Sequence, residues 1–171
     1  LAASQPGFSG MVCMPGTHSK WAQLSGWHID HFSTAMTGEL YEVLRTHSVL
    51  RHSLTGDLDG PGRADGFAAG ATAGLDHPEH LLGTLFQVRA GALLSDRQPD
   101  WCAGYLSGLL IGTEIGGYRH LIGQQAVPLI GAEALCGLYA QVLDMIGATG
   151  VLHDSTTIVL AGLKAARNYA A

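Results

Sequence analysis

The chain has 171 residues, enough for one ordinary domain, and a formal net charge of -5 at pH 7. Hydrophobic residues make up 47 % of it and charged residues 13 %, which excludes an intrinsically disordered segment, because disorder needs high charge and few apolar groups. The 9 Lys and Arg residues form no basic cluster, so we do not expect binding to nucleic acid by neutralisation of phosphates.

The cysteines and the N-terminus indicate a cytoplasmic protein. Cys13, Cys102 and Cys136 are odd in number and widely spaced, so no disulfide framework follows. No basic segment precedes an apolar core, so no secretory signal is expected. The most membrane-like stretch, residues 101–117, contains Glu114 and is shorter than the ~20 apolar residues that a membrane span needs. We expect a buried helix there and no membrane partner.

The N-terminal part predicts three strands. Residues 11–14 are an apolar run ended by Pro15-Gly16, typical of a buried strand that enters a tight loop. Residues 20–24 and 27–34 are two further strands, and Ser25-Gly26 between them is a two-residue hairpin signal.

A helix over residues 38–50 should follow, capped by Thr37, with Glu39 in its first turn, where the helix dipole favours negative charge. Its inner face is predicted to carry Leu40, Val43, Leu44 and His47. Residues 51–78 then repeat glycine with proline and aspartate. We expect a long mobile insertion there, either a surface insertion or a lid, with a short helix around 66–72.

Two helices are predicted next, over residues 78–94 and 99–121, the second capped by Asp96 or Gln98. The second helix has glycine at every fourth position: Gly104, Gly108, Gly112 and Gly116. Each should cost about 1 kcal/mol relative to alanine, so another group must approach this stripe closely. Either tight packing of the helix on a sheet or a bound ligand would account for it.

The last part predicts a strand over residues 126–130, a helix over 133–146, a strand over 150–153 and a final helix capped by Asp154 or Ser155. The complete order is β-β-β-α, an insertion, then β-α-β-α. This α/β order is that of the ribonuclease-H-like fold, which occurs twice in the actin, hexokinase and Hsp70 superfamily.

The loop after the first strand is the sharpest chemical feature. In Gly16-Thr17-His18-Ser19-Lys20, small residues expose backbone N–H groups, hydroxyls add donors, and the lysine adds a positive charge. Together these groups could hold phosphate oxygens. The loop is not a Walker A motif, because the Gly-x4-Gly-Lys spacing is absent. A polar hairpin turn without a ligand would look similar.

Two more segments are candidate binding sites. Thr37-Gly38-Glu39 is a predicted helix N-terminus that could bind an anion or a sugar hydroxyl, or be an ordinary cap. Gly131-Ala132-Glu133 lies where a strand opens into a helix, the place where α/β folds bind ligands.

The nine histidines do not indicate a metal site. His28 with His31, and His77 with His80, lie three residues apart, but no third ligand stands at a recognisable spacing. No HExxH or GxSxG motif occurs. We expect exposed polar histidines and no metal ligands. A small hydrolase or metalloprotein built on these histidines is the weakest alternative.

Several segments resemble the 2-dehydro-3-deoxygalactonokinase family, in the family's order. The longest are Val12-Cys13-Met14-Pro15-Gly16-Thr17-His18-Ser19-Lys20-Trp21 and Met36-Thr37-Gly38-Glu39-Leu40. The other matching residues are Phe32, 47–50, 85–90, 105–114, 127–131 and 161–163. The resemblance therefore covers nearly the whole chain.

The resemblance implies an ATP-dependent kinase that phosphorylates 2-dehydro-3-deoxy-D-galactonate to its 6-phosphate in galactonate breakdown, with ATP and Mg²⁺ between two ribonuclease-H-like lobes. Residues 16–20 would be the second phosphate loop, with Gly16, Thr17, His18 and Ser19 on the nucleotide and Lys20 on the transferred phosphate. Gly131, Ala132 and Glu133 would contact adenosine, with Gly112 nearby. Thr37, Gly38 and Glu39 would bind the sugar acid, and Glu39 is the one candidate catalytic base.

The chain also departs from the family. The Asp-Trp-Gly-Thr/Ser loop that opens the family's N-terminal lobe is absent. We therefore expect residues 1–171 to be a single C-terminal lobe without its N-terminal lobe, which could self-associate. The alternative is a non-catalytic nucleotide-binding or interaction domain of the same fold.

Overall fold

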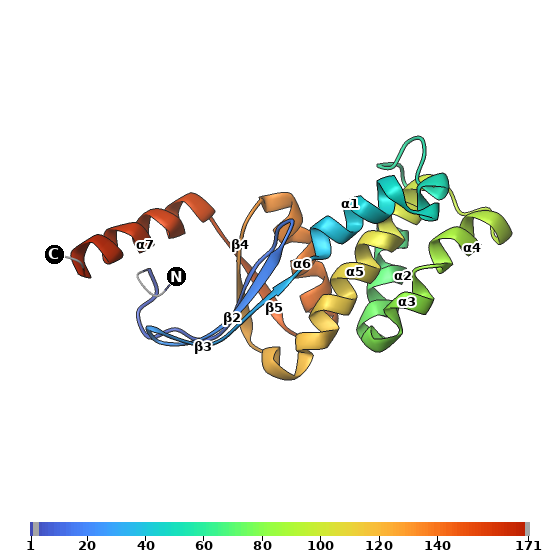
Figure 1. Cartoon of the computed structure of the whole chain (residues 1–171). Coiled ribbons are helices and arrows are strands. Elements are labelled where there is room, and N and C mark those ends of the chain that lie inside the picture. Colours follow the sequence, from blue (N-terminus) through green and yellow to red (C-terminus); the bar gives the residue numbers. More distant parts are fainter. Residues whose placement is uncertain (2–3, 170–171) are drawn as a thin grey trace. The chain divides into compact units, whose positions relative to one another are not determined.

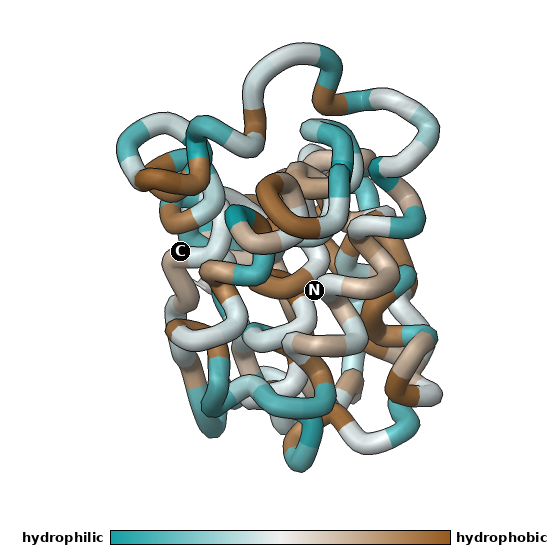
Figure 2. Tube along the Cα trace, turned by 90° about the vertical axis from the view of Figure 1, so that its right-hand side faces the viewer, coloured by the Kyte–Doolittle hydropathy of each residue, from teal (hydrophilic) through white to brown (hydrophobic). Residues whose placement is uncertain are grey.

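The computed structural model describes residues 1 and 4–169. The chain forms two compact units (Figure 1). Unit 1 consists of Leu1–Ala35 and Leu121–Ala171, and unit 2 of Met36–His120. Hydrophobic stretches are distributed along the whole trace (Figure 2), and in the described part of the chain no helix is long and apolar enough to cross a membrane. The expected single lobe stays a prediction.

Unit 1 is built on a mixed five-stranded sheet. Its strands are β1 (Ser9–Met14), β2 (Ser19–Ser25), β3 (His28–Ala35), β4 (Ala126–Ile130) and β5 (Thr149–His153), in the order β3-β2-β1-β4-β5. The pairs β1–β2 and β2–β3 are antiparallel, whereas β1–β4 and β4–β5 are parallel. The predicted α/β class and all five strands are confirmed.

Two helices complete unit 1. Helix α6 (Glu133–Met145) packs against β4 and β5 and buries Cys136, Tyr139, Val142 and Leu143. Val12, Cys13 and Trp21 of β1 and β2 are buried as well, and since successive residues of a strand point to opposite faces, both faces of the central strands are covered. Helix α7 (Ser155–Tyr169) follows β5 and exposes Val159, Leu160 and Leu163.

The β2–β3 hairpin differs from its prediction by one residue. Ser25 pairs with His28, so the turn consists of Gly26 and Trp27 rather than Ser25 and Gly26. Gly26 has φ 60°, a left-handed conformation that favours glycine. The pairing then passes from Ile29 to His31 and leaves Asp30 as an extra residue. This bulge explains why the apolar residues of β3 do not alternate cleanly.

Unit 2 is helical. Its elements are α1 (Thr37–His47), the 3-10 helix η1 (Val49–Ser53), α2 (Arg63–Asp76), the 3-10 helix η2 (Pro78–His80), α3 (Leu81–Thr84), α4 (Gln87–Leu94) and α5 (Pro99–Ile122). The prediction for α5 is confirmed. The single helix predicted over 78–94 is wrong, because the apolar spacing there does not follow one face: Leu82 is 86 % and Phe86 57 % exposed.

The predicted face of α1 is half right. Leu40 and Leu44 pack against the core of unit 2, but Val43 and His47 are exposed, and the helix ends at His47. Thr37 is not the cap. Met36 holds that position, with no side-chain cap, while the Thr37 hydroxyl donates to the Glu114 carboxylate.

The short helix predicted around 66–72 is confirmed and is longer than expected, because α2 spans residues 63–76, so the long loop predicted over 51–78 is wrong for that segment. Its glycines Gly66, Gly70 and Gly74 face α5, and Gly104, Gly108 and Gly112 of α5 face α2. A Cβ atom at Gly70 would lie 2.1 Å from the Tyr105 carbonyl oxygen, and one at Gly108 would lie 2.0 Å from that of Phe67. Backbone therefore touches backbone along both helices, and packing of helix on helix accounts for the glycine stripe.

This contact predicts opposite effects for two glycines of α5. Gly108→Ala should lower the free energy of unfolding by roughly 3 kcal/mol, because the new methyl group must push two backbones apart. Gly117→Ala should raise it by about 0.5–1 kcal/mol, because a Cβ there meets nothing within 4 Å and alanine favours the helix. Urea unfolding of both variants measures this. Equal effects would mean that the two helices are not in backbone contact.

Candidate functional site

The candidate site lies at one edge of the sheet of unit 1. Strands β1, β4 and β5 are parallel and adjacent, so their carboxyl ends meet there. The segments that follow them are the loop 15–18, the turn at Gly131 and Ala132, and Asp154. Ligands of open α/β sheets bind outside such strand ends, because the loops there are free to carry polar groups.

Two side-chain hydrogen bonds hold the loop after β1 in place, one to helix α6 and one within the loop. Ser19 is fully buried, and its hydroxyl shares a hydrogen bond of 2.8 Å with the Tyr139 hydroxyl of α6. Lys20 Nζ donates to the His18 carbonyl oxygen over 2.7 Å, while the side chains of Thr17 and His18 are exposed. The predicted donor role of the Ser19 hydroxyl is therefore corrected: it anchors the loop to α6 and points into the core.

The loop after β1 and the turn after β4 touch each other. A Cβ atom at Gly131 would lie 2.9 Å from the Pro15 carbonyl oxygen and 3.4 Å from Cys136 Sγ. Only glycine lets the two backbones approach this closely. The structure thus brings together two of the segments that the sequence indicated separately, 16–19 and 131–133.

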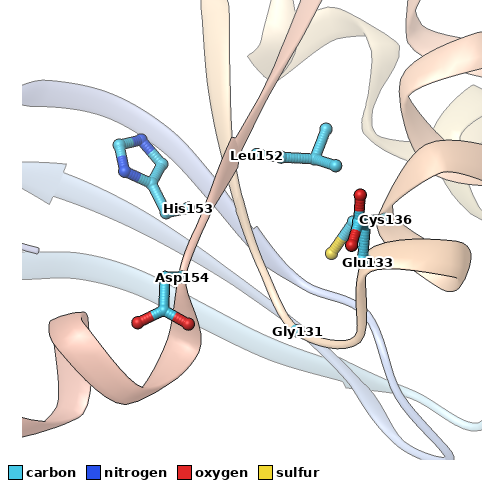
Figure 3. A pocket seen from close by; sticks show the side chains of 6 residues that line it. All are labelled: Gly131, Glu133, Cys136, Leu152, His153 and Asp154. Atoms are coloured by element: carbon cyan, nitrogen blue, oxygen red, sulfur yellow. The ribbon is translucent and has the colours of Figure 1, made fainter.

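A cavity of about 310 Å³ opens beside Gly131 (Figure 3). It is lined by Gly131, Glu133, Cys136, Leu152, His153 and Asp154. Figure 3 shows Glu133 and Cys136 at the start of α6, and Leu152 and His153 on opposite sides of β5. His153 Nε2 is buried and has no hydrogen-bond partner among the described residues. A buried polar atom without a partner is costly, so it indicates a place for a ligand group or a water.

The cavity is acidic at its rim. Asp154 accepts hydrogen bonds from the Thr157 hydroxyl and backbone N–H, at 2.6 and 2.7 Å, and these bonds hold the pKa of its carboxyl below the usual range. Burial raises the pKa of the Cys136 thiol, which favours its neutral form. Two carboxylates, Glu133 and Asp154, disfavour phosphate and suit hydroxyl or amine donors.

Four predicted site residues belong to unit 2. Thr37, Gly38 and Glu39 form the first turn of α1, where the Thr37 hydroxyl is taken by the buried Glu114. Gly112 lies against the backbone of α2, where its Cβ would be 2.4 Å from the Ala71 carbonyl oxygen. The expected nucleotide contact of Gly112 is therefore corrected: α2 occupies the space in front of it.

The two histidine pairs differ in their surroundings. His77 and His80 gain a third donor, because Glu79 lies between them and the three donor atoms lie within 4.8 Å of one another. The structure thus places a third candidate donor beside this pair, and the expectation that the histidines are not metal ligands stays a prediction. The sequence spacing did not indicate Glu79 as a third donor, because the turn at Pro78, rather than a regular helix or strand, sets the positions of these side chains.

Comparison with known proteins decides the family. A family model described as 2-keto-3-deoxy-galactonokinase matches residues 1–166. The chain belongs to this family. The resemblance drawn from the sequence segments is thereby confirmed.

Relatives of the kinase family agree with this assignment. The chain is 39 % identical over 166 residues to a protein from Rhizobium meliloti named probable 2-dehydro-3-deoxygalactonokinase, and 35 % identical over 157 residues to the 2-dehydro-3-deoxygalactonokinase of Escherichia coli. These alignments cover 92 % and 91 % of the chain but 52 % of each relative. The chain thus spans about half the length of the curated relatives it matches.

A solved structure supports the fold. A crystal structure of a protein from Sinorhizobium meliloti that carries the 2-dehydro-3-deoxygalactonokinase name superposes with a TM-score of 0.83 at 36 % identity. The match covers 96 % of this chain and 55 % of that one. The α/β architecture of this chain is therefore similar to that of the solved protein.

Sequence reasoning missed His153 and Cys136 as lining residues of the cavity. A usable signal existed for His153, which ends a predicted strand directly before a helix, the same position that singled out Gly131. Cys136 gave no signal, because a buried cysteine in an apolar helix face has the pattern of core.

The bond between Ser19 and Tyr139 predicts a coupled pair of variants. Ser19→Ala and Tyr139→Phe should each lower the free energy of unfolding by about 1–3 kcal/mol, because each removes the hydrogen bond between two buried hydroxyls. The double variant should lose roughly 1 kcal/mol less than the sum of the two. A double-mutant cycle in urea measures this coupling, and strictly additive losses would contradict the bond.

The cap of α7 predicts a response to acid. The pKa of Asp154 is lowered in the folded protein from its ordinary 3.8, so its stabilising effect is complete above about pH 4 and is lost as the pH falls through the folded value. Asp154→Asn keeps an oxygen acceptor at the cap but does not titrate. Far-UV circular dichroism should show wild type losing more helix than Asp154→Asn below pH 4. Parallel curves would contradict this role.

Proposed function

We propose that this chain is the C-terminal half of an ATP-dependent kinase that phosphorylates 2-dehydro-3-deoxy-D-galactonate to its 6-phosphate. The backbone contact between Gly131 and Pro15 carries the proposal, since it joins a loop suited to phosphates to a cavity suited to a nucleoside. The names of the relatives support the substrate and the reaction.

Unit 1 is proposed as a ribonuclease-H-like lobe. The strand order β3-β2-β1-β4-β5, antiparallel over the first three and parallel over the last three, supports this assignment. So does the order of the elements, with α6 between β4 and β5 and α7 after β5.

The nucleotide would lie across the two loops. The cavity is within the size range of small-molecule sites, and its unpartnered His153 Nε2 and the carboxylates of Glu133 and Asp154 fit the polar groups of adenosine. Gly131 and Ala132 would let its sugar approach the backbone. The phosphates would extend toward residues 16–18, away from the acidic rim.

ATP supplies the transferred phosphoryl group, and Mg²⁺ neutralises charge on its oxygens. The chain's own contribution is positioning. The backbone N–H groups of Gly16, Thr17 and His18 and the Thr17 hydroxyl would hold phosphate oxygens, because the side chains there are exposed and the loop is fixed by Ser19. Lys20 would exchange its bond to the His18 carbonyl oxygen for a phosphate oxygen.

The sugar acid would meet the first turn of α1. Since Glu114 takes the Thr37 hydroxyl, we assign the contacts to the backbone N–H groups of Thr37 and Gly38 and to the Glu39 carboxylate, which would accept the proton of the attacking hydroxyl. A cytoplasmic location is proposed because Cys13, Cys102 and Cys136 form no disulfide within the described residues, and self-association is proposed from the exposed apolar residues of β3.

The alternative is a nucleotide-binding domain without kinase activity. It would use the same loops after β1 and β4 to bind the nucleotide and differs in transferring no phosphoryl group. Release of ADP from ATP and Mg²⁺ separates the two functions, measured with and without 2-dehydro-3-deoxy-D-galactonate. ADP release that depends on the sugar acid establishes the kinase; ATP binding with no release establishes the binding domain.

Two glycines test the nucleotide site. Gly131→Ala should weaken ATP binding about tenfold, because the new methyl group forces the loops after β1 and β4 apart. Gly137→Ala in α6 is the matched control, since a Cβ there meets nothing within 4 Å. Isothermal titration with ATP measures the affinity of both glycine variants, and equal affinities would remove Gly131 from the site.

Lys20→Ala should lower turnover in the active protein while leaving the unfolding midpoint unchanged.

A further inference from the structure

The turn between α2 and α3 brings two imidazoles and a carboxylate together. His77 Nδ1 lies 3.2 Å and His80 Nε2 lies 3.8 Å from the same oxygen, Glu79 Oε1. All three donor atoms lie within 4.8 Å of one another. Within residues 1 and 4–169 no second group of three such donors meets this condition. The cluster belongs to unit 2 and shares no residue with the proposed nucleotide site.

The backbone of the turn places these side chains. His77 ends α2, Pro78 restricts the backbone at the first position of η2, and the His80 N–H donates to the His77 carbonyl oxygen over 3.0 Å. In a 3-10 turn, residues three apart lie directly above each other. The two rings accordingly stack, with centroids 5.1 Å apart and planes 21° apart.

The turn is fixed at its start, while its side chains are free to adjust. Leu75, two residues before His77, is buried, and the glycines of α2 hold that helix against α5. The side chains of His77, Glu79 and His80 are 63 %, 62 % and 66 % exposed. Small shifts of their donor atoms therefore cost little packing.

We propose that His77, Glu79 and His80 form a binding site for one divalent transition-metal ion, with Zn²⁺ as the representative. Donors around a tetrahedral Zn²⁺ at about 2.1 Å stand roughly 3.4 Å apart, between the two distances to Glu79 Oε1. Two imidazole nitrogens and one oxygen suit Zn²⁺, Ni²⁺ or Cu²⁺, whereas Mg²⁺ prefers oxygen donors. Three protein donors leave a fourth position for water.

The charge state of Glu79 agrees with this chemistry. A hydrogen bond from its own backbone N–H, and then one from His77, hold the pKa of its carboxyl below the usual range. An ionised carboxylate is the form that binds a metal ion.

Isothermal titration of the metal-stripped full chain with zinc chloride, in the absence of ATP, tests the site. We expect one Zn²⁺ per chain with a dissociation constant in the micromolar range. His77→Gln and His80→Gln should each weaken binding at least about tenfold, since each removes one of three protein donors. His31→Gln, an exposed histidine of β3 outside the cluster, is the matched control and should bind as wild type.

Two measurements keep the outcome unambiguous. Thermal unfolding without metal should be the same for wild type and all three variants, because the replaced side chains are exposed. Millimolar Mg²⁺ should leave the Zn²⁺ affinity unchanged. The proposal is overturned by the absence of stoichiometric binding, by binding that survives both His77→Gln and His80→Gln, or by displacement of Zn²⁺ by Mg²⁺. None of these results depends on kinase activity.

Discussion

The parallel pairing of β1 with β4 is the contact on which unit 1 and its site depend. Cys13 of β1 lies beside Leu129 of β4, and both side chains are fully buried. This pairing joins residues 1–35 to residues 121–171 across all of unit 2. Because it closes so long a loop, its entropic cost is met by burial of the central strands rather than by local structure. Without it, the loop after β1 and the turn after β4 would not meet.

The meeting of those loops separates two kinds of polar surface. On the side of β1 the loop offers backbone N–H groups, the Thr17 hydroxyl and the nearby Lys20. Around the cavity, the carboxylates of Glu133 and Asp154 offer acceptors. A nucleotide has the same division, with a charged phosphate end and a neutral end rich in donors. The proposed nucleotide site would therefore favour one direction of binding over the other, because the reversed ligand would place phosphates against carboxylates.

Periodicity and turn chemistry predicted the strands and α5, because these elements depend on local signals. The glycines of α2 predicted a long loop instead of the full helix, since a glycine that lets two backbones touch cannot be told by residue type from one in a loop. The strand-end loops could be placed from sequence, but the Ser19–Tyr139 bond could not, because its partners are far apart in the chain. The same holds for the contact between Thr37 and Glu114.

The direct contact of α2 with α5 has an evolutionary consequence. Every substitution of a glycine adds at least a Cβ atom. No residue of intermediate size therefore exists that would change this contact without displacing a helix. The six facing glycines cannot be exchanged one at a time for slightly larger residues, as leucine and valine can in a side-chain core. Substitutions within α2 and α5 are thus expected on the faces that point away from this contact, and the spacing of four residues should outlast most of the sequence around it.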